Sequence, residues 1–170
     1  VHTIHGGGVY YLEKYKGVPK TLPRFLHWFK WDAYLTWVTG FLLLVIVYFA
    51  NPQATLLRPG SALSPALGVA LAVGSLALAW LVYVGLSKTE LLYRPALFGL
   101  LGLVFFAGMA LALSLVFSGR GAFILVGAMI GTIMAGNVFF VIIPSQKKLI
   151  RSAQAGEALS PEFVRWVQLR

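Results

Sequence analysis

The sequence predicts an all-α integral membrane protein with four antiparallel transmembrane helices and basic, amphipathic cytoplasmic flanks. The first observation behind this fold is a set of four apolar stretches of 19 to 22 residues, at 32–50, 65–86, 96–117 and 122–143. At about 1.5 Å of rise per residue, each stretch covers roughly 30 Å, the thickness of the hydrocarbon core of a bilayer. The last three stretches contain no charged residue, so they have no face that suits water.

The second observation is the position of the basic residues, since the chain has 14 Lys and Arg against 5 Asp and Glu. Only Arg58 and Arg120 fall on one side of the predicted membrane. The other twelve fall on the opposite side: Lys14, Lys16, Lys20, Arg24, Lys30, Lys88, Arg94, Lys147, Lys148, Arg151, Arg165 and Arg170. By the positive-inside rule, this basic side and both ends of the chain are cytoplasmic. Topology and contact with anionic membrane lipids therefore explain the net charge of +9, and we expect no nucleic-acid partner.

Composition also limits the chemistry that this chain can carry. The absence of cysteine excludes disulfides, cysteine-ligated iron–sulfur clusters, a cysteine nucleophile and a covalently attached c-type haem within the chain. Four helices and their connections account for nearly all of the 170 residues, so we expect one transmembrane domain at 32–144. A cytoplasmic or interfacial segment at 1–31 precedes it, and an amphipathic cytoplasmic tail at 145–170 follows it.

The segments before the second span have local signals of their own. We expect a short helix on the membrane surface at Val9–Lys16, ended by the glycine and prolines that follow it. Aromatic residues at 28–34 are typical of a membrane interface and predict the start of the first span. The connection at 51–64 contains Pro52, Pro59 and Gly60 and is typical of an ordinary loop.

Prolines and glycines predict how the later helices begin and pack. Pro65 and Pro95 suit the first turn of the second and third spans, and Ser160 with the proline after it predicts a helix in the tail. Gly127 and Gly131 lie four residues apart in the fourth span. Small residues at this spacing let helices approach closely in lipid, so we expect close contacts within a compact bundle.

Reactive side chains are scarce in the predicted bundle and gather at its cytoplasmic surface. His27, Lys30 and Asp32 flank the start of the first span, and Asn137 lies near the cytoplasmic end of the fourth. These four are the candidate catalytic residues, since imidazole and carboxylate groups transfer protons at neutral pH. Each also has a structural interpretation: packing among tryptophans for His27, an ion pair for the two charged residues, and an interhelical hydrogen bond for Asn137.

His2 and His5 are the candidate cofactor-binding residues. Their spacing of three residues would place both imidazoles on one face of a helix, where they could serve a haem or a metal. Two histidines without a third ligand bind metal weakly, so a terminal segment without a ligand is the plainer interpretation, and no metal site is predicted. No histidine lies at mid-depth in a span, so a haem would need flanking segments or a partner.

Two segments resemble a known family when they are read whole. The first is HGGGVY from His5, followed by WFKWDAYLTW from Trp28, and the second is GNVFFVIIPSQKK from Gly136. Together they resemble the membrane domain of the bacterial cytochrome c-linked urate hydroxylases, the urate oxidase N-terminal family. That family usually has Glu at the position of Asp32 and Asn at the position of Ser145, so the match has two mild departures.

The resemblance implies a location and an activity. Family members are longer proteins of the bacterial inner membrane, many with a periplasmic cytochrome c domain, so this chain would be an internal portion of the membrane domain. The implied reaction oxidises urate with water as oxygen donor and cytochrome c as electron acceptor. His5 and His27 would bind haem or transfer protons. Lys30 and Asp32 would orient the anionic purine, and Asn137 would hydrogen-bond it.

Two other functions stay open. A non-catalytic scaffold or electron-transfer subunit of a respiratory or photosynthetic complex would explain an apolar bundle without redox ligands at depth, and its partners would be other membrane subunits. A transporter is the weaker alternative, because such proteins usually carry broken helices or buried charges within their spans.

Overall fold

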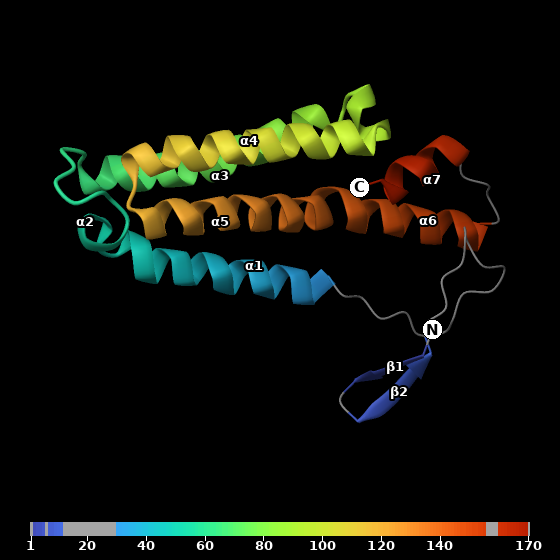
Figure 1. The fold of residues 1–170 in the computed structure, drawn as a ribbon. Coiled ribbons are helices and arrows are strands. Elements are labelled where there is room, and N and C mark those ends of the chain that lie inside the picture. The colour runs from blue at the N-terminus through green and yellow to red at the C-terminus, as the bar shows by residue number, and fades with distance from the viewer. Residues whose placement is uncertain (1, 6, 12–29, 156–159, 170) are drawn as a thin grey trace.

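Four long apolar helices dominate the computed structural model, which describes residues 2–5, 7–11, 30–155 and 160–169 (Figure 1). The long helices are α1 (Lys30–Leu44) with the π-helical turn η1 (Val45–Phe49), α3 (Pro65–Leu86), α4 (Pro95–Val116), and α5 (Gly119–Asn137) with the π-helical turn η3 (Val138–Ile142) and α6 (Ile143–Ala155). The shorter elements are β1 (His2–His5), β2 (Gly8–Tyr11), α2 (Pro52–Thr55), the 3₁₀ turn η2 (Glu90–Tyr93) and α7 (Pro161–Gln168). In the described part of the chain, four helices are long and apolar enough to cross a membrane, which confirms the predicted helical membrane fold.

Local capping chemistry fixes where the helices begin. The hydroxyl oxygens of Ser64, Ser118 and Ser160 accept hydrogen bonds from backbone N–H groups three residues later. Each of these bonds satisfies one of the free N–H groups that every helix start leaves. Proline occupies the start of α3, α4 and α7, where its missing N–H costs nothing, so the predicted helix starts are confirmed.

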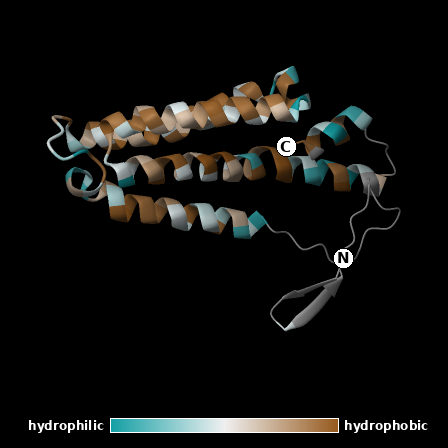
Figure 2. Cartoon of the chain, in the orientation of Figure 1, coloured by the Kyte–Doolittle hydropathy of each residue, from teal (hydrophilic) through white to brown (hydrophobic). Residues whose placement is uncertain are grey.

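Helix α5 is the centre of the bundle, because it contacts α1, α3 and α4 (Figure 1). The buried core between these helices is small and apolar: Leu44, Ala72, Leu76, Ala79, Leu113, Leu125 and Met129. Large apolar side chains also point outward, with Phe123 82% exposed. Figure 2 shows hydrophobic residues covering the long helices, as expected where lipid tails replace water as the solvent.

One end of the bundle, the closed end, is sealed by the connection between η1 and α3. Leu56 and Leu57 are 0% and 2% exposed, and Leu57 pairs with Phe117 in an isolated antiparallel bridge. The backbone N–H of Ser118 donates to the oxygen of Leu56 at 2.8 Å, and its hydroxyl donates to the oxygen of Thr55 at 3.2 Å. The segment connects two long helices, as predicted, but it contains the short helix α2, and its two leucines are part of the core.

The opposite end, the basic end, carries Lys88, Arg94 and the lysines of α6. The fourth helix runs from Gly119 to Ser152 without a break, about 50 Å at 1.5 Å per residue, which exceeds the hydrocarbon thickness. It continues through Pro144, whose ring and missing N–H normally disrupt a helix. The preceding turn is widened, with the N–H of Ile143 donating to the oxygen of Val138, and such a π-turn accommodates the change. Helix α6 therefore projects beyond the apolar part of the bundle.

The N-terminal segment contains an antiparallel hairpin, the one described departure from an all-helical chain. His2 pairs with Tyr11 and His5 with Gly8, while Gly7 has a φ of +79° in the turn. Glycine adopts that conformation without strain, and the flanking β-branched and aromatic residues favour strands. The predicted surface helix is therefore wrong for residues 9–11, and its remainder lies outside the described residues. The helical argument for His2 and His5 is wrong as well, because their backbone is extended.

Candidate functional site

The structure brings the two family-like segments together at the basic end. The ring of Tyr34, from the start of α1, lies 5.3 Å from the ring of Phe139 in η3. One turn deeper, the indole N–H of Trp37 donates to the hydroxyl of Thr132 on α5 at 3.2 Å. Segments about a hundred residues apart in the chain thus form one aromatic surface, which is where an interfacial site was predicted.

Gly136 on α5 determines how closely Trp80 of α3 can approach this aromatic surface. A Cβ atom on Gly136 would lie 2.7 Å from the ring of Trp80, closer than real Cβ contacts allow. The missing side chain therefore lets the Trp80 indole lie against α5. From there the indole reaches Phe140, with ring centroids 5.9 Å apart, and Tyr83, also at 5.9 Å. Aromatic residues from α1, α3 and η3 meet here.

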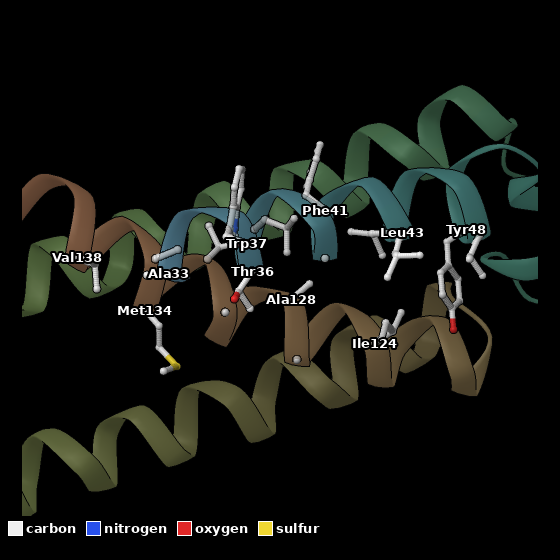
Figure 3. Close-up of a pocket in the computed structure, with 18 of the residues that line it drawn as sticks. Ala33, Thr36, Trp37, Phe41, Leu43, Tyr48, Ile124, Ala128, Met134 and Val138 are labelled. Atoms are coloured by element: carbon white, nitrogen blue, oxygen red, sulfur yellow. The ribbon is translucent and has the colours of Figure 1, made fainter. Parts of the chain in front are cut away.

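A long groove of about 750 Å³ runs between α1 and α5 (Figure 3). Asp32 lines one end and Tyr48 the other, with Trp37 stacked on Phe41 between them at 5.3 Å. Its walls are otherwise almost entirely apolar. A Cβ added at Gly40, Gly127 or Gly131 would meet nothing within 4 Å, so these glycines leave the groove open. The predicted close contacts at Gly127 and Gly131 are therefore wrong for the described part of the chain.

Two smaller cavities lie beside Trp80. The first, about 410 Å³, has aromatic walls from α1, α3 and η3 and is lined by Tyr34, Trp37, Val38, Trp80, Thr132, Ala135, Gly136, Phe139 and Phe140. The second, about 570 Å³, is the interfacial pocket and is lined by Trp80, Val84, Lys88, Phe140, Val141 and Trp166. Trp80 and Phe140 line both cavities, so the two are neighbours at the basic end.

Helix α7 packs over this end through cations and rings. The ammonium of Lys148 on α6 lies 4.6 Å from the Phe163 ring centroid, and the guanidinium of Arg165 lies 5.5 Å from that of Tyr93. These cation–π contacts tie α7 to α6 and to the connection between α3 and α4. They place Trp166 where it forms a wall of the interfacial pocket.

The predicted catalytic residues are only partly brought together. Asp32 is exposed in the first turn of α1, where the helix dipole favours a carboxylate, and it lines the groove. The ammonium of Lys30 lies 5.2 Å from the Trp31 ring centroid. Asn137 is 6% exposed at the end of α5 and is not among the described residues that line the cavities above. His27 lies outside the described residues.

Sequence reasoning missed the interfacial pocket. A tryptophan such as Trp80 near the end of a span is typical of an interfacial anchor, and Lys88 is one of the twelve basic residues on one side of the predicted membrane. The available signal was a tryptophan at the basic end of a span, followed within eight residues by a lysine. That signal is common in membrane proteins, so it could not single out these two residues.

The described side chains form no cluster that is typical of a metal site. No group of three His, Cys, Asp or Glu that could hold a metal ion occurs among them. Only the backbone of His2 and His5 is described, so their role in binding haem stays a prediction.

The chain was compared with known proteins. The family model described as urate oxidase N-terminal matches residues 1–170. No curated protein and no solved structure matched. The match covers the four-helix membrane bundle and both of the segments that meet at its basic end. The chain therefore belongs to the urate oxidase N-terminal family.

Proposed function

We propose that this chain is the membrane domain of an oxidoreductase that oxidises urate, or a closely related heterocyclic anion, and passes the electrons to cytochrome c. The observation that carries the proposal is the family match over the whole chain. The meeting of Tyr34 and Phe139 supports it, because it gathers both family-like segments at one end of the bundle. The basic charge of that end favours an anionic substrate.

The proposed reaction balances with water and cytochrome c alone. A ring carbon of urate gains a hydroxyl oxygen from water, and urate and water together release two electrons and two protons. Two ferric cytochromes c take up one electron each. The protons need an acceptor near the substrate, and an exposed carboxylate at the mouth of a groove can act as that base.

Asp32 is the candidate for this role among the described side chains. It is the only aspartate in the chain, and it lies at the polar end of an otherwise apolar groove. Lys30 would orient the anion from the first turn of α1, and Asn137 would offer a hydrogen bond from the end of α5. His2, His5 and His27 stay candidates for proton transfer or for haem binding, in the bacterial inner membrane with the basic end cytoplasmic.

A second function is favoured by the open groove between α1 and α5. Its exposed glycines suit close packing of another membrane helix, as expected of a non-catalytic scaffold or electron-transfer subunit. The two functions are separable, because a scaffold would be retained with partner subunits and would not oxidise urate on its own.

The test is cytochrome c reduction by the purified full-length protein that contains this chain. Urate should drive the appearance of the reduced cytochrome spectrum, and heavy oxygen from labelled water should enter the product. Reduction without urate, or product oxygen that comes from O₂, would contradict the proposed reaction. Retention of the protein only in a complex, with no urate-dependent reduction, would favour the scaffold.

Replacing Asp32 by Asn should lower kcat by about 100-fold or more, the usual contribution of a general base. The steady-state rate of cytochrome c reduction measures the effect. Glu90→Gln is the matched control, since Glu90 is an exposed carboxylate at the same end that lines none of the described cavities. Equal losses in the two variants would assign the effect to surface charge and remove Asp32 from the chemistry.

A further inference from the structure

The interfacial pocket combines three aromatic rings with one cation. Trp80 comes from α3, Phe140 from η3 and Trp166 from α7, and Val84 and Val141 complete its apolar walls. Lys88, in the connection after α3, is its only charged residue among the described lining residues. The volume of about 570 Å³ is within the range of small-molecule sites.

One aromatic wall, Trp80, is held in place by neighbours outside the pocket. Trp80 lies against Gly136, where a Cβ would come within 2.7 Å of its ring, and it stacks on Tyr83 at an interplanar angle of 28°. Fixed indole and phenyl rings bind flat conjugated ligands by stacking and by burying apolar area. The shape and chemistry of the walls therefore suit a planar ring.

Charge restricts the ligand further. No carboxylate is among the described lining residues, so none of them competes for the Lys88 ammonium or repels an anion. The side chain of Lys88 is exposed, and an ammonium donates stronger hydrogen bonds to an anion than a neutral donor does. A planar ring that carries a negative charge can stack on the aromatic walls and pair with the Lys88 ammonium.

We infer that the interfacial pocket binds the anionic heterocycle itself, with Lys88 as its counter-ion and with Trp80 and Trp166 stacked against its ring. This inference rests on the proposed function for the identity of the substrate. It places the anion between α3 and α7, beside the aromatic cavity that shares Trp37 and Thr132 with the groove lined by Asp32. Gly136, Phe140 and Val141 belong to the second family-like segment, so that segment builds a wall of the pocket.

Equilibrium dialysis of labelled urate against the full-length protein in neutral-lipid nanodiscs, without cytochrome c, tests the site directly. Lys88→Gln should weaken urate binding about 10- to 100-fold, as expected when a hydrogen bond to a charged group is lost. Lys147→Gln removes the same charge from the same end without touching the pocket, and it should bind as the wild type does. Trp166→Leu should weaken binding, whereas Trp166→Phe should retain most of it.

The outcomes separate this inference from the proposed function. If the wild type turns over urate while Lys88→Gln and Lys147→Gln bind urate with equal affinity, the proposed site is wrong. The proposed reaction is unaffected by that result. A wild-type protein that neither binds nor oxidises urate would overturn both. Loss of urate binding on adding an anionic phospholipid would assign the pocket to a lipid headgroup and overturn the substrate site.

Discussion

The two ends of the bundle differ in how tightly their side chains pack. At the closed end, Leu56, Leu57 and Phe117 are buried and the Ser118 N–H and hydroxyl each donate to a backbone oxygen. At the basic end, aromatic rings leave two cavities between them and a cation stands at the rim of one. The comparison indicates that the closed end holds the helices together, while the basic end leaves space between its aromatic side chains.

The largest expected effect on stability tests the closed end. Leu57→Ala should lower the free energy of unfolding by about 2–5 kcal/mol, because the lost side chain leaves a cavity beside Gly68 and Phe117. Unfolding of the purified protein in mixed detergent, followed by circular dichroism, measures the change. Leu115→Ala is the control, since Leu115 is 73% exposed. Similar midpoints for the two variants would contradict the special role of this end.

A smaller loss is expected from Gly121→Ala, about 1–3 kcal/mol. The new Cβ would lie 2.7 Å from the backbone oxygen of Leu56, which also accepts the hydrogen bond from Ser118 and cannot move away freely. Gly127→Ala is the matched change on the same helix, with nothing within 4 Å of its Cβ. It should leave the stability unchanged or raise it by up to about 1 kcal/mol through helix propensity. A loss of equal size in Gly127→Ala would show that the open groove is filled.

The smallest loss of stability is expected at the basic end. Gly136→Ala also creates a contact at 2.7 Å, but with the Trp80 ring, a side chain that can shift. The cost should be about 1 kcal/mol, at the low end for overpacking, while urate binding weakens because Trp80 moves. Gly131→Ala, which has open space around it, is the control for both measurements. If Gly136→Ala is destabilised as much as Gly121→Ala and its urate affinity is unchanged, the claim that the two ends differ in packing is wrong.

Much of the fold was predictable because its signals are local. Span length, the N-cap at Ser160 and the prolines at helix starts depend on neighbouring residues, and their predictions are confirmed. The hairpin differs from the surface helix expected at 9–16, because the β-branched and aromatic side chains of residues 9–11 favour a strand. Among the candidate site residues, Asp32 is expected at the start of the first span, and it lies there in the first turn of α1.

The sequence by itself determined that lipid surrounds four apolar helices and that one end is basic, since hydropathy and charge act residue by residue. Only the tertiary structure decided that Leu56 and Leu57 enter the core and that Gly136 receives the Trp80 ring. It also decided that Lys88 joins rings from three other elements in one pocket. These features depend on which helices become neighbours, and close packing between distant segments leaves no periodic mark in the chain.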